Sequence, residues 1–260
     1  MVYYDGRLLL VHLAVKYQGN YDKIMAALHL PEDVPYEVAL ETYNSLKCKV
    51  LTYLDYDYPE KLKQVNRPPI VLFYYGDISL LNERIVATVG SRNFDKCGKD
   101  STEKILKELI PGIVLISGMA RGIDTIAHEC AIKNGARTIA VLGSGIDYVY
   151  PPENQLLYNM LKKKHLVISE YPGMTPPEPS QFPERNRIVV GLADCVFVPQ
   201  VNNYMTGTMI SVNLALTLGK PVVVAPHPVY SETVNNVLIY EGAIIAIDGE
   251  QIKYELKIKD

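Results

Sequence analysis

The sequence is poor in cysteine and histidine, the residues that most often build redox centres and transition-metal sites. Its 260 residues include four cysteines and five histidines. The cysteines lie far apart, and none forms a CxxC motif or stands beside a histidine at the spacing of metal ligands. Isolated thiols of this kind are typical of buried packing residues. We therefore expect neither a redox function, nor a metal site, nor a cofactor.

Long apolar runs and a secretion signal are also missing. No stretch approaches the roughly 18 uninterrupted apolar residues that a membrane span needs. The amino terminus lacks the basic start and the small-residue cleavage site of a signal peptide. We therefore expect a cytoplasmic protein that does not act at a membrane.

An excess of basic charge is absent as well. The 26 Lys and Arg residues face 29 Asp and Glu residues, which gives a formal net charge of −3. Without a general positive field, the protein must hold any polyanion with a local patch. The composition is otherwise that of an ordinary globular protein, with 48% apolar and 21% charged residues.

The first quarter of the chain differs in pattern from the rest. Up to about residue 55, apolar residues such as Leu9, Leu13 and Ile24 recur at helical spacing. We expect a small helical N-terminal domain over residues 1–57, followed by a turn-rich connector. A second domain is expected over residues 58–260.

In that second domain, β-branched apolar runs alternate with helical patterns. The expected strands cover residues 70–76, 85–89, 113–117, 138–142, 166–169, 195–198, 222–225 and 243–247. The expected helices cover residues 96–110, 122–134, 153–164, 185–192, 207–218 and 235–241. This alternation predicts an α/β fold, in which helices cover both faces of a mostly parallel sheet.

Three of the expected strands end in glycine-containing segments that suit an anion. In an open parallel sheet, ligands bind at the carboxyl ends of the strands. Helix N-termini there offer unpaired N–H groups, and arginine offers a two-pronged donor to phosphate. The segments are Val89-Gly90-Ser91-Arg92, Ser117-Gly118-Met119-Ala120-Arg121-Gly122 and Leu142-Gly143-Ser144-Gly145. The alternative is that the glycines only form tight turns and the arginines only cap or bridge.

Two further segments have the same character. Phe182-Pro183-Glu184-Arg185-Asn186-Arg187 follows a proline-rich loop and leads into a helix. Its arginines can bind successive phosphates, and Phe182 can stack on a base; alternatively, Phe182 packs the loop and the arginines pair with carboxylates. Thr206-Gly207-Thr208 precedes another helix, where its hydroxyls can contact phosphate or form an ordinary helix cap.

The usual nucleotide fingerprints do not occur. Gly143-Ser144-Gly145 is not continued as GxGxxG, and the GxxxxGK[ST] pattern is absent. NAD or ATP binding thus has little support. Catalysis has little support too, because Ser117 and Asp124 lie near His128 in sequence without forming a recognisable triad order.

Taken in order, these motifs resemble the DprA/Smf family. The resemblance extends from about residue 58 to residue 248. It rests on residues 89–92, 117–124, 139–143 with Tyr150-Pro151, Ser169-Glu170, 182–187 and 241–243. It implies an extended Rossmann-like domain behind a small helical domain, without enzymatic activity. Homodimers of this kind bind single-stranded DNA without sequence preference and load the recombinase RecA onto it during natural transformation.

The resemblance also implies which residues line the phosphate-binding pocket. They are Ser91, Arg92, Gly118, Arg121, Arg185, Asn186 and Arg187. From the residues alone we add Gly90, Ser117, Gly122, Thr206, Gly207 and Thr208 as phosphate contacts, and Phe182 as a stacking residue.

Two other functions stay open. A nucleotide-binding enzyme of the phosphoribohydrolase type shares such turns, although Thr206-Gly207-Thr208 lacks the Pro-Gly-Gly before it and the acidic residue after it. A protein-interaction role with a vestigial pocket would suit the weak net charge. Four arginines near helix starts speak against that role.

Overall fold

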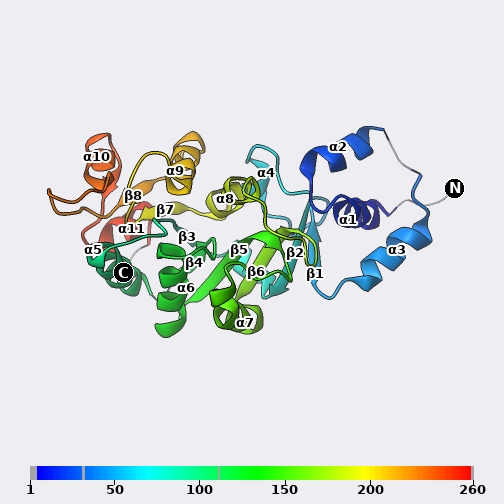
Figure 1. Cartoon of the computed structure of the whole chain (residues 1–260), viewed down its shortest axis with the longest axis horizontal. Helices are drawn as coiled ribbons and strands as arrows, with labels where there is room; N and C mark the ends of the chain where they lie inside the picture. The colour runs from blue at the N-terminus through cyan, green and yellow to red at the C-terminus, as the bar shows by residue number, and fades with distance from the viewer. Residues whose placement is uncertain (1–4, 31–32, 111, 259–260) are drawn as a thin grey trace.

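One sheet organises the molecule (Figure 1). The computed structural model describes residues 5–30, 33–110 and 112–258. Within these residues nine strands pair in the order β1-β2-β6-β5-β4-β3-β7-β8-β9. The strands are β1 (Lys49–Thr52), β2 (Val71–Gly76), β3 (Ile85–Thr88), β4 (Val114–Ser117), β5 (Arg137–Gly145), β6 (Leu166–Tyr171), β7 (Cys195–Val198), β8 (Val222–Val224) and β9 (Ile244–Ile245).

Most neighbouring strands run parallel. Every pairing from β6 through β5, β4, β3, β7 and β8 to β9 is parallel, whereas β1 and β2 add an antiparallel edge. The predicted α/β fold with a mostly parallel, Rossmann-like sheet is confirmed. After β3 the chain builds one half of the sheet through β4, β5 and β6, and then returns to β7 on the other side of β3. The switch point therefore lies between β3 and β7, where such folds commonly bind ligands.

Helices cover both faces of this sheet (Figure 1). Apolar side chains of one face form a single core with α4 (Glu60–Lys63), α8 (Gln181–Leu192), α9 (Gly207–Thr217) and α10 (Asn235–Tyr240). The opposite face packs against α5 (Lys96–Leu109), α6 (Ile123–Lys133), α7 (Gln155–Lys164) and α11 (Glu250–Glu255). Two short 3₁₀ turns, η1 (Ile78–Asn82) and η2 (Pro152–Asn154), connect elements. Burial on both sides explains why the central strands are almost wholly apolar.

Three N-terminal helices pack beside the antiparallel edge: α1 (Gly6–Lys16), α2 (Tyr21–His29) and α3 (Tyr36–Ser45). Asp5 and Asn20 cap the first two by accepting hydrogen bonds from backbone N–H groups of the first turn. Leu10, Val11 and Ile24 share a core with strands of the sheet. The helical pattern of this segment is therefore reproduced in the residues that the structure describes.

Strand β1 departs from the sequence prediction. The sequence predicts helical structure up to about residue 55, yet Lys49–Thr52 pairs with β2 and belongs to the sheet. This strand forms because it pairs with Val71–Tyr74, and the sequence of four residues alone does not predict such a tertiary contact. The division into a domain of residues 1–57 and a domain of residues 58–260 stays a prediction. Residues 1–4 and 259–260, at the two ends of these domains, lie outside the described part of the chain.

Helix α8 begins earlier than expected. It starts at Gln181, whereas the sequence predicts a start at residue 185. Pro183 lies in the first turn, where the missing N–H of proline costs no intrahelical bond. Phe182 and Arg185 therefore belong to one helix, which fixes their relative direction. Within the described residues, no helix is long and apolar enough to span a membrane.

Candidate functional site

A groove of about 910 Å³ opens at the carboxyl ends of β3 and β7. Its walls come from the segments that follow these two strands and from the first turns of α8 and α9. This is the switch point of the sheet. Ten of the fourteen candidate residues line it: Gly90, Ser91, Arg92, Gly118, Phe182, Arg185, Asn186, Thr206, Gly207 and Thr208.

Arg185 forms the floor of the groove. Its guanidinium is buried and donates hydrogen bonds to the carbonyl oxygens of Gly118, directly after β4, and of Val141, within β5. A Cβ at position 118 would collide with this guanidinium, so a larger residue there would have to displace it. Burial lowers the pKa of Arg185, and the neighbouring carboxylate of Asp124 opposes that effect. The charge of Arg185 is thus partly balanced inside the protein.

Arg92 is the exposed cation of the groove. Its guanidinium lies 5.7 Å from the centre of the Phe182 ring, within the range of a cation–π contact. The ring of Tyr150 lies 5.6 Å from that of Phe182, tilted by 42°. Positive charge and aromatic surface therefore meet at one place on the groove wall. Among the described residues, no carboxylate forms an ion pair with Arg92.

Hydrogen bonds hold the groove loops in place. The hydroxyl of Ser91 accepts from the N–H of Asn202, which ties the segment after β3 to the segment after β7. Asn186 donates from its side chain to the carbonyl of Gly207 and so joins α8 to α9. Thr206 caps α9, because its hydroxyl accepts from the N–H of Met209. For Thr206 the helix-cap interpretation is therefore the one the structure supports.

Three candidate residues lie outside the groove lining and contact other parts of the protein. The Ser117 hydroxyl donates to the carbonyl of Thr88 at 2.7 Å and is fully buried. Gly122 has a φ of +83°, and a Cβ there would lie 2.4 Å from the carbonyl oxygen of Ser91. The exposed Arg121 pairs with Glu153 of η2.

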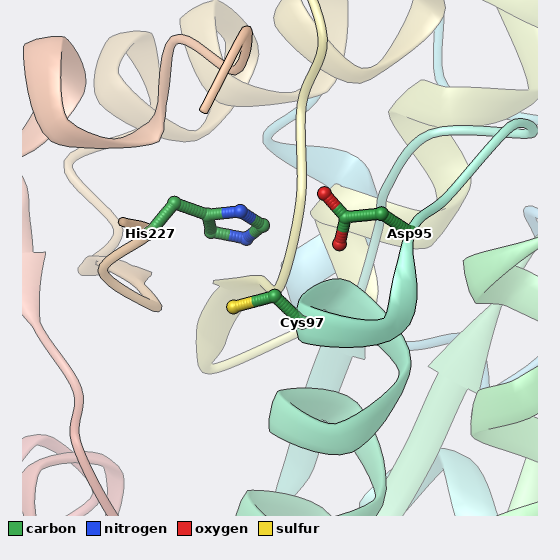
Figure 2. Close-up of side chains that lie close together, drawn as sticks. All are labelled: Asp95, Cys97 and His227. Carbon is green, nitrogen blue, oxygen red and sulfur yellow. The ribbon is translucent and has the colours of Figure 1, made fainter. Parts of the chain in front are cut away.

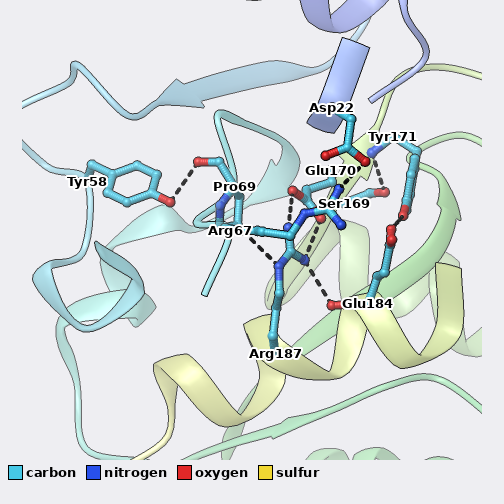
Figure 3. A network of polar contacts seen from close by, with 9 residues as sticks. All are labelled: Asp22, Tyr58, Arg67, Pro69, Ser169, Glu170, Tyr171, Glu184 and Arg187. Atoms are coloured by element: carbon cyan, nitrogen blue, oxygen red, sulfur yellow. Dashed lines mark hydrogen bonds and ion pairs between the residues drawn. The ribbon is translucent and has the colours of Figure 1, made fainter. Parts of the chain in front are cut away.

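The fourth, Arg187, points from α8 toward Glu170 at the end of β6 (Figure 3). Its guanidinium donates to both carboxylate oxygens of Glu170, at 2.6 and 2.7 Å, and to the carbonyl of Arg67. The side chains are only 13% and 6% exposed. Burial raises the pKa of Glu170, and the charge of Arg187 opposes this rise. Arg67 in turn pairs with Asp22 of α2, so the network joins α8 to the N-terminal helices.

The sequence reasoning missed several groove residues. Tyr150 and Tyr204 are exposed aromatic residues on its lining, and Asn93, Asn202 and Asn203 supply amide groups. Tyr150 precedes a proline in one of the family motifs, which was a usable signal. The asparagines follow β3 and β7, so knowledge of the strand order was needed to bring them together.

Ser117 and His128 each hydrogen-bond to another residue. His128 is fully buried, and its Nδ1 bonds to the hydroxyl of Thr138, away from Ser117. Burial lowers the pKa of His128 to about 3, so this side chain is neutral at physiological pH. A separate group of possible metal ligands lies at the start of α5: Asp95, Cys97 and His227 (Figure 2).

Comparison with known proteins places the chain in a family. The profile of the DNA recombination-mediator protein A family matches residues 49–257. The chain belongs to this family. DNA processing protein DprA of Streptococcus pneumoniae is 38% identical over 213 residues, which are 81% of this chain and 75% of that protein. DprA of Bacillus subtilis is 35% identical over 221 residues, 84% of this chain and 74% of the relative.

Solved structures agree with this placement. The crystal structure of DprA from S. pneumoniae has a TM-score of 0.79 at 33% identity and covers 95% of this chain and 93% of its own. DprA from Helicobacter pylori, described by its single-stranded DNA binding mode, has a TM-score of 0.73 at 29% identity, covering 83% of this chain and 98% of its own. The DprA/Smf resemblance and the Rossmann-like fold are therefore confirmed, and the family is one of DNA recombination mediators.

Proposed function

We propose that the protein binds single-stranded DNA in the groove between α8 and α9, without sequence preference. The observation that carries this proposal is the contact of Arg92 with Phe182, whose ring packs against Tyr150, on an open groove at the switch point. Single strands are held by this combination of positive charge with stacking platforms. The binding mode described for H. pylori DprA supports the same substrate class.

In this proposal the phosphates lie along a short path. They contact the guanidinium of Arg92 and the N-terminal turn of α9 at Gly207 and Thr208, where the helix dipole favours an anion. Arg185 contributes positive potential from the floor, because its N–H groups already serve the carbonyls of Gly118 and Val141. Arg121 stays in the contact set, since its exposed pair with Glu153 is one that a phosphate can replace.

Ser117, Gly122 and Arg187 leave the proposed contact set. Each is engaged with the protein itself, as described above. The bases stack on Phe182 and Tyr150, which tolerate any base because every base has a π-face. No bond is made or broken in this function, which agrees with the separate, occupied positions of Ser117 and His128.

The wider role follows from the family. We propose that the bound strand is passed to the recombinase RecA in the cytoplasm, and that the protein acts as a homodimer during natural transformation. Membership in the recombination-mediator family supports a handover of this kind. In this proposal the bases stack on Phe182 and Tyr150 and stay unpaired, which suits a strand awaiting another protein.

The experiment is fluorescence anisotropy with labelled oligo-dT, a duplex of equal length and unlabelled AMP as competitor, at two salt concentrations. We expect the single strand to bind more tightly than the duplex, and more weakly at higher salt because counterions are released from the phosphates on binding. AMP should not displace it. Displacement by AMP, or equal binding of duplex and single strand, would refute the proposal and favour a small-nucleotide site.

A further inference from the structure

Three side chains with metal-binding atoms converge beside the groove, although the sequence separates Cys97 from His227 by 130 residues (Figure 2). A carboxylate oxygen of Asp95, the sulfur of Cys97 and a ring nitrogen of His227 all lie within 4.8 Å of one another. Asp95 and Cys97 belong to the start of α5, and His227 follows β8. We infer that these residues form a binding site for a divalent transition metal, zinc above all.

The ligand types select the class of metal. Thiolate and imidazole ligands suit zinc and related transition metals, whereas magnesium and calcium take oxygen ligands. Three protein ligands with a fourth position for water are a common zinc arrangement. In a tetrahedral zinc site the ligand atoms are about 3.3–3.8 Å apart. Here they lie within 4.8 Å of one another, so each pair of donor atoms has to approach by at most about 1.0–1.5 Å.

A backbone contact sets the tautomer of the histidine. Its Nε2 lies 3.0 Å from the carbonyl oxygen of Pro199. Because a carbonyl can only accept, this bond keeps the proton on Nε2 and leaves the lone pair on Nδ1. The hydroxyl of Ser231 lies 3.5 Å from Nδ1, and a metal ion bound there would replace this contact. Histidines that bind metals usually have such a backbone or carboxylate partner on the second nitrogen. The backbone of His227 is also fixed, since its N–H and its carbonyl both bond to the side chain of Asn236.

The carboxylate is held as well. Asp95 caps α5 by accepting from the N–H of Gly98 with Oδ1, so the second oxygen stays available for a cation. The backbone N–H of Asp95 donates to Gln200, which also bonds to Asn202 of the groove. A bound metal would therefore connect the start of α5 to the segment after β8, directly behind the groove wall. Thiolate and carboxylate together would neutralise its two positive charges.

The test is a titration of the chelator-treated, full-length protein with Co²⁺, followed by absorption spectroscopy. We expect one equivalent of Co²⁺ to give a sulfur-to-cobalt charge-transfer band and the visible bands of a tetrahedral site. Zn²⁺ should abolish both, because zinc binds such sites more tightly than cobalt. No charge-transfer band in the wild-type protein would overturn the inference.

Variants assign the site. Cys97→Ser should remove the charge-transfer band. It should lower the affinity for Zn²⁺ by more than about 100-fold, because losing a direct ligand costs more than losing a partner that only orients one, which costs up to about 100-fold. His227→Gln should weaken binding as well. Cys48→Ser, which changes a half-buried thiol outside the cluster, is the matched control and should bind as the wild type does. A band that survives in Cys97→Ser would assign the metal to another thiol and overturn the inference.

A second readout does not depend on spectra. Zn²⁺ should raise the melting temperature of the wild-type protein and of Cys48→Ser, because a ligand that binds only the folded state stabilises it. It should leave that of Cys97→Ser unchanged. Since Cys97 is only partly buried, this variant is expected to fold, and an equal rise in all three proteins would contradict the proposed site.

Discussion

Arg92 and Arg187 come from two different motifs and have different roles, so replacing each by alanine tests binding and stability separately. Arg92→Ala removes one exposed cation from the groove. For single strands, the slope of log K against log salt becomes shallower by about 0.7 for each phosphate that the protein no longer neutralises. The factor by which affinity drops between 50 and 200 mM salt should therefore be about 2.6 times smaller for the variant than for the wild type. The loss of one charged hydrogen bond should weaken binding by about 1–2 kcal/mol, or ~5- to 30-fold.

Arg187→Ala should act on folding instead. It leaves the carboxylate of Glu170 only 6% exposed and without its partner. Removing one member of a buried ion pair costs about 3–5 kcal/mol of unfolding free energy. The cost should shrink at low pH, because burial raises the pKa of Glu170 and the unpaired carboxyl takes up a proton there. Adding Glu170→Gln to the variant should recover part of the stability.

The assays are urea unfolding, read by circular dichroism, and anisotropy with oligo-dT at several salt concentrations below the unfolding transition. Arg137→Ala is the matched control, since this arginine forms a half-exposed surface pair with Asp77. It should change neither measurement by a significant amount. The reasoning is refuted if Arg187→Ala lowers the salt dependence as Arg92→Ala does while its unfolding free energy stays at the wild-type value.

Three further changes test other parts of the site. Gly118→Ala places a methyl group 2.4 Å from the Arg185 guanidinium and should cost about 1–3 kcal/mol of unfolding free energy, measured in urea; an unchanged midpoint would contradict the packing argument. Phe182→Leu should weaken oligo-dT binding by about 1–3 kcal/mol in anisotropy without changing the salt dependence, unlike the removal of a phosphate-binding cation. His128, whose pKa burial lowers to about 3, stays neutral in the folded protein while the unfolded chain takes up a proton below pH 6.5. The unfolding free energy should therefore fall by up to about 1.4 kcal/mol per pH unit as the pH drops between these two values. His128→Gln should lack this loss when urea unfolding is compared at pH 7 and pH 5. An equal loss in the variant and the wild type would count against the argument.

The fold was more predictable from sequence than the site. Strand Cys195–Val198 lies at its predicted bounds, because a buried apolar run flanked by turn residues has few other interpretations. Residues directly after the strands, such as Ser91 and Gly118, could be grouped because parallel strands end at one edge. The order of the motifs also indicates the correct family.

The direction of long side chains could not be predicted. Arg185 and Arg187 are two residues apart on one helix, which turns them to different sides of α8. One lies in the groove floor, and the other finds Glu170, a residue 17 positions earlier at the end of β6. Such pairing depends on the packing of α8 against the sheet. Cys97 and His227 show the same limit, since only the order of β3, β7 and β8 brings them together.

Strand β1 makes the N-terminal segment and the sheet hard to cut apart. A variant that lacks residues 1–57 would lose Lys49–Thr52. The outer edge of β2 would then have no partner strand. Unpaired edges of this kind invite association between chains. It would also strip Leu10, Val11 and Ile24 from an apolar core shared with the sheet. If a protein shortened in this way aggregates, the cause is the disrupted sheet and not the loss of a separate domain. A variant that begins at Lys49 would keep all strands of the described sheet.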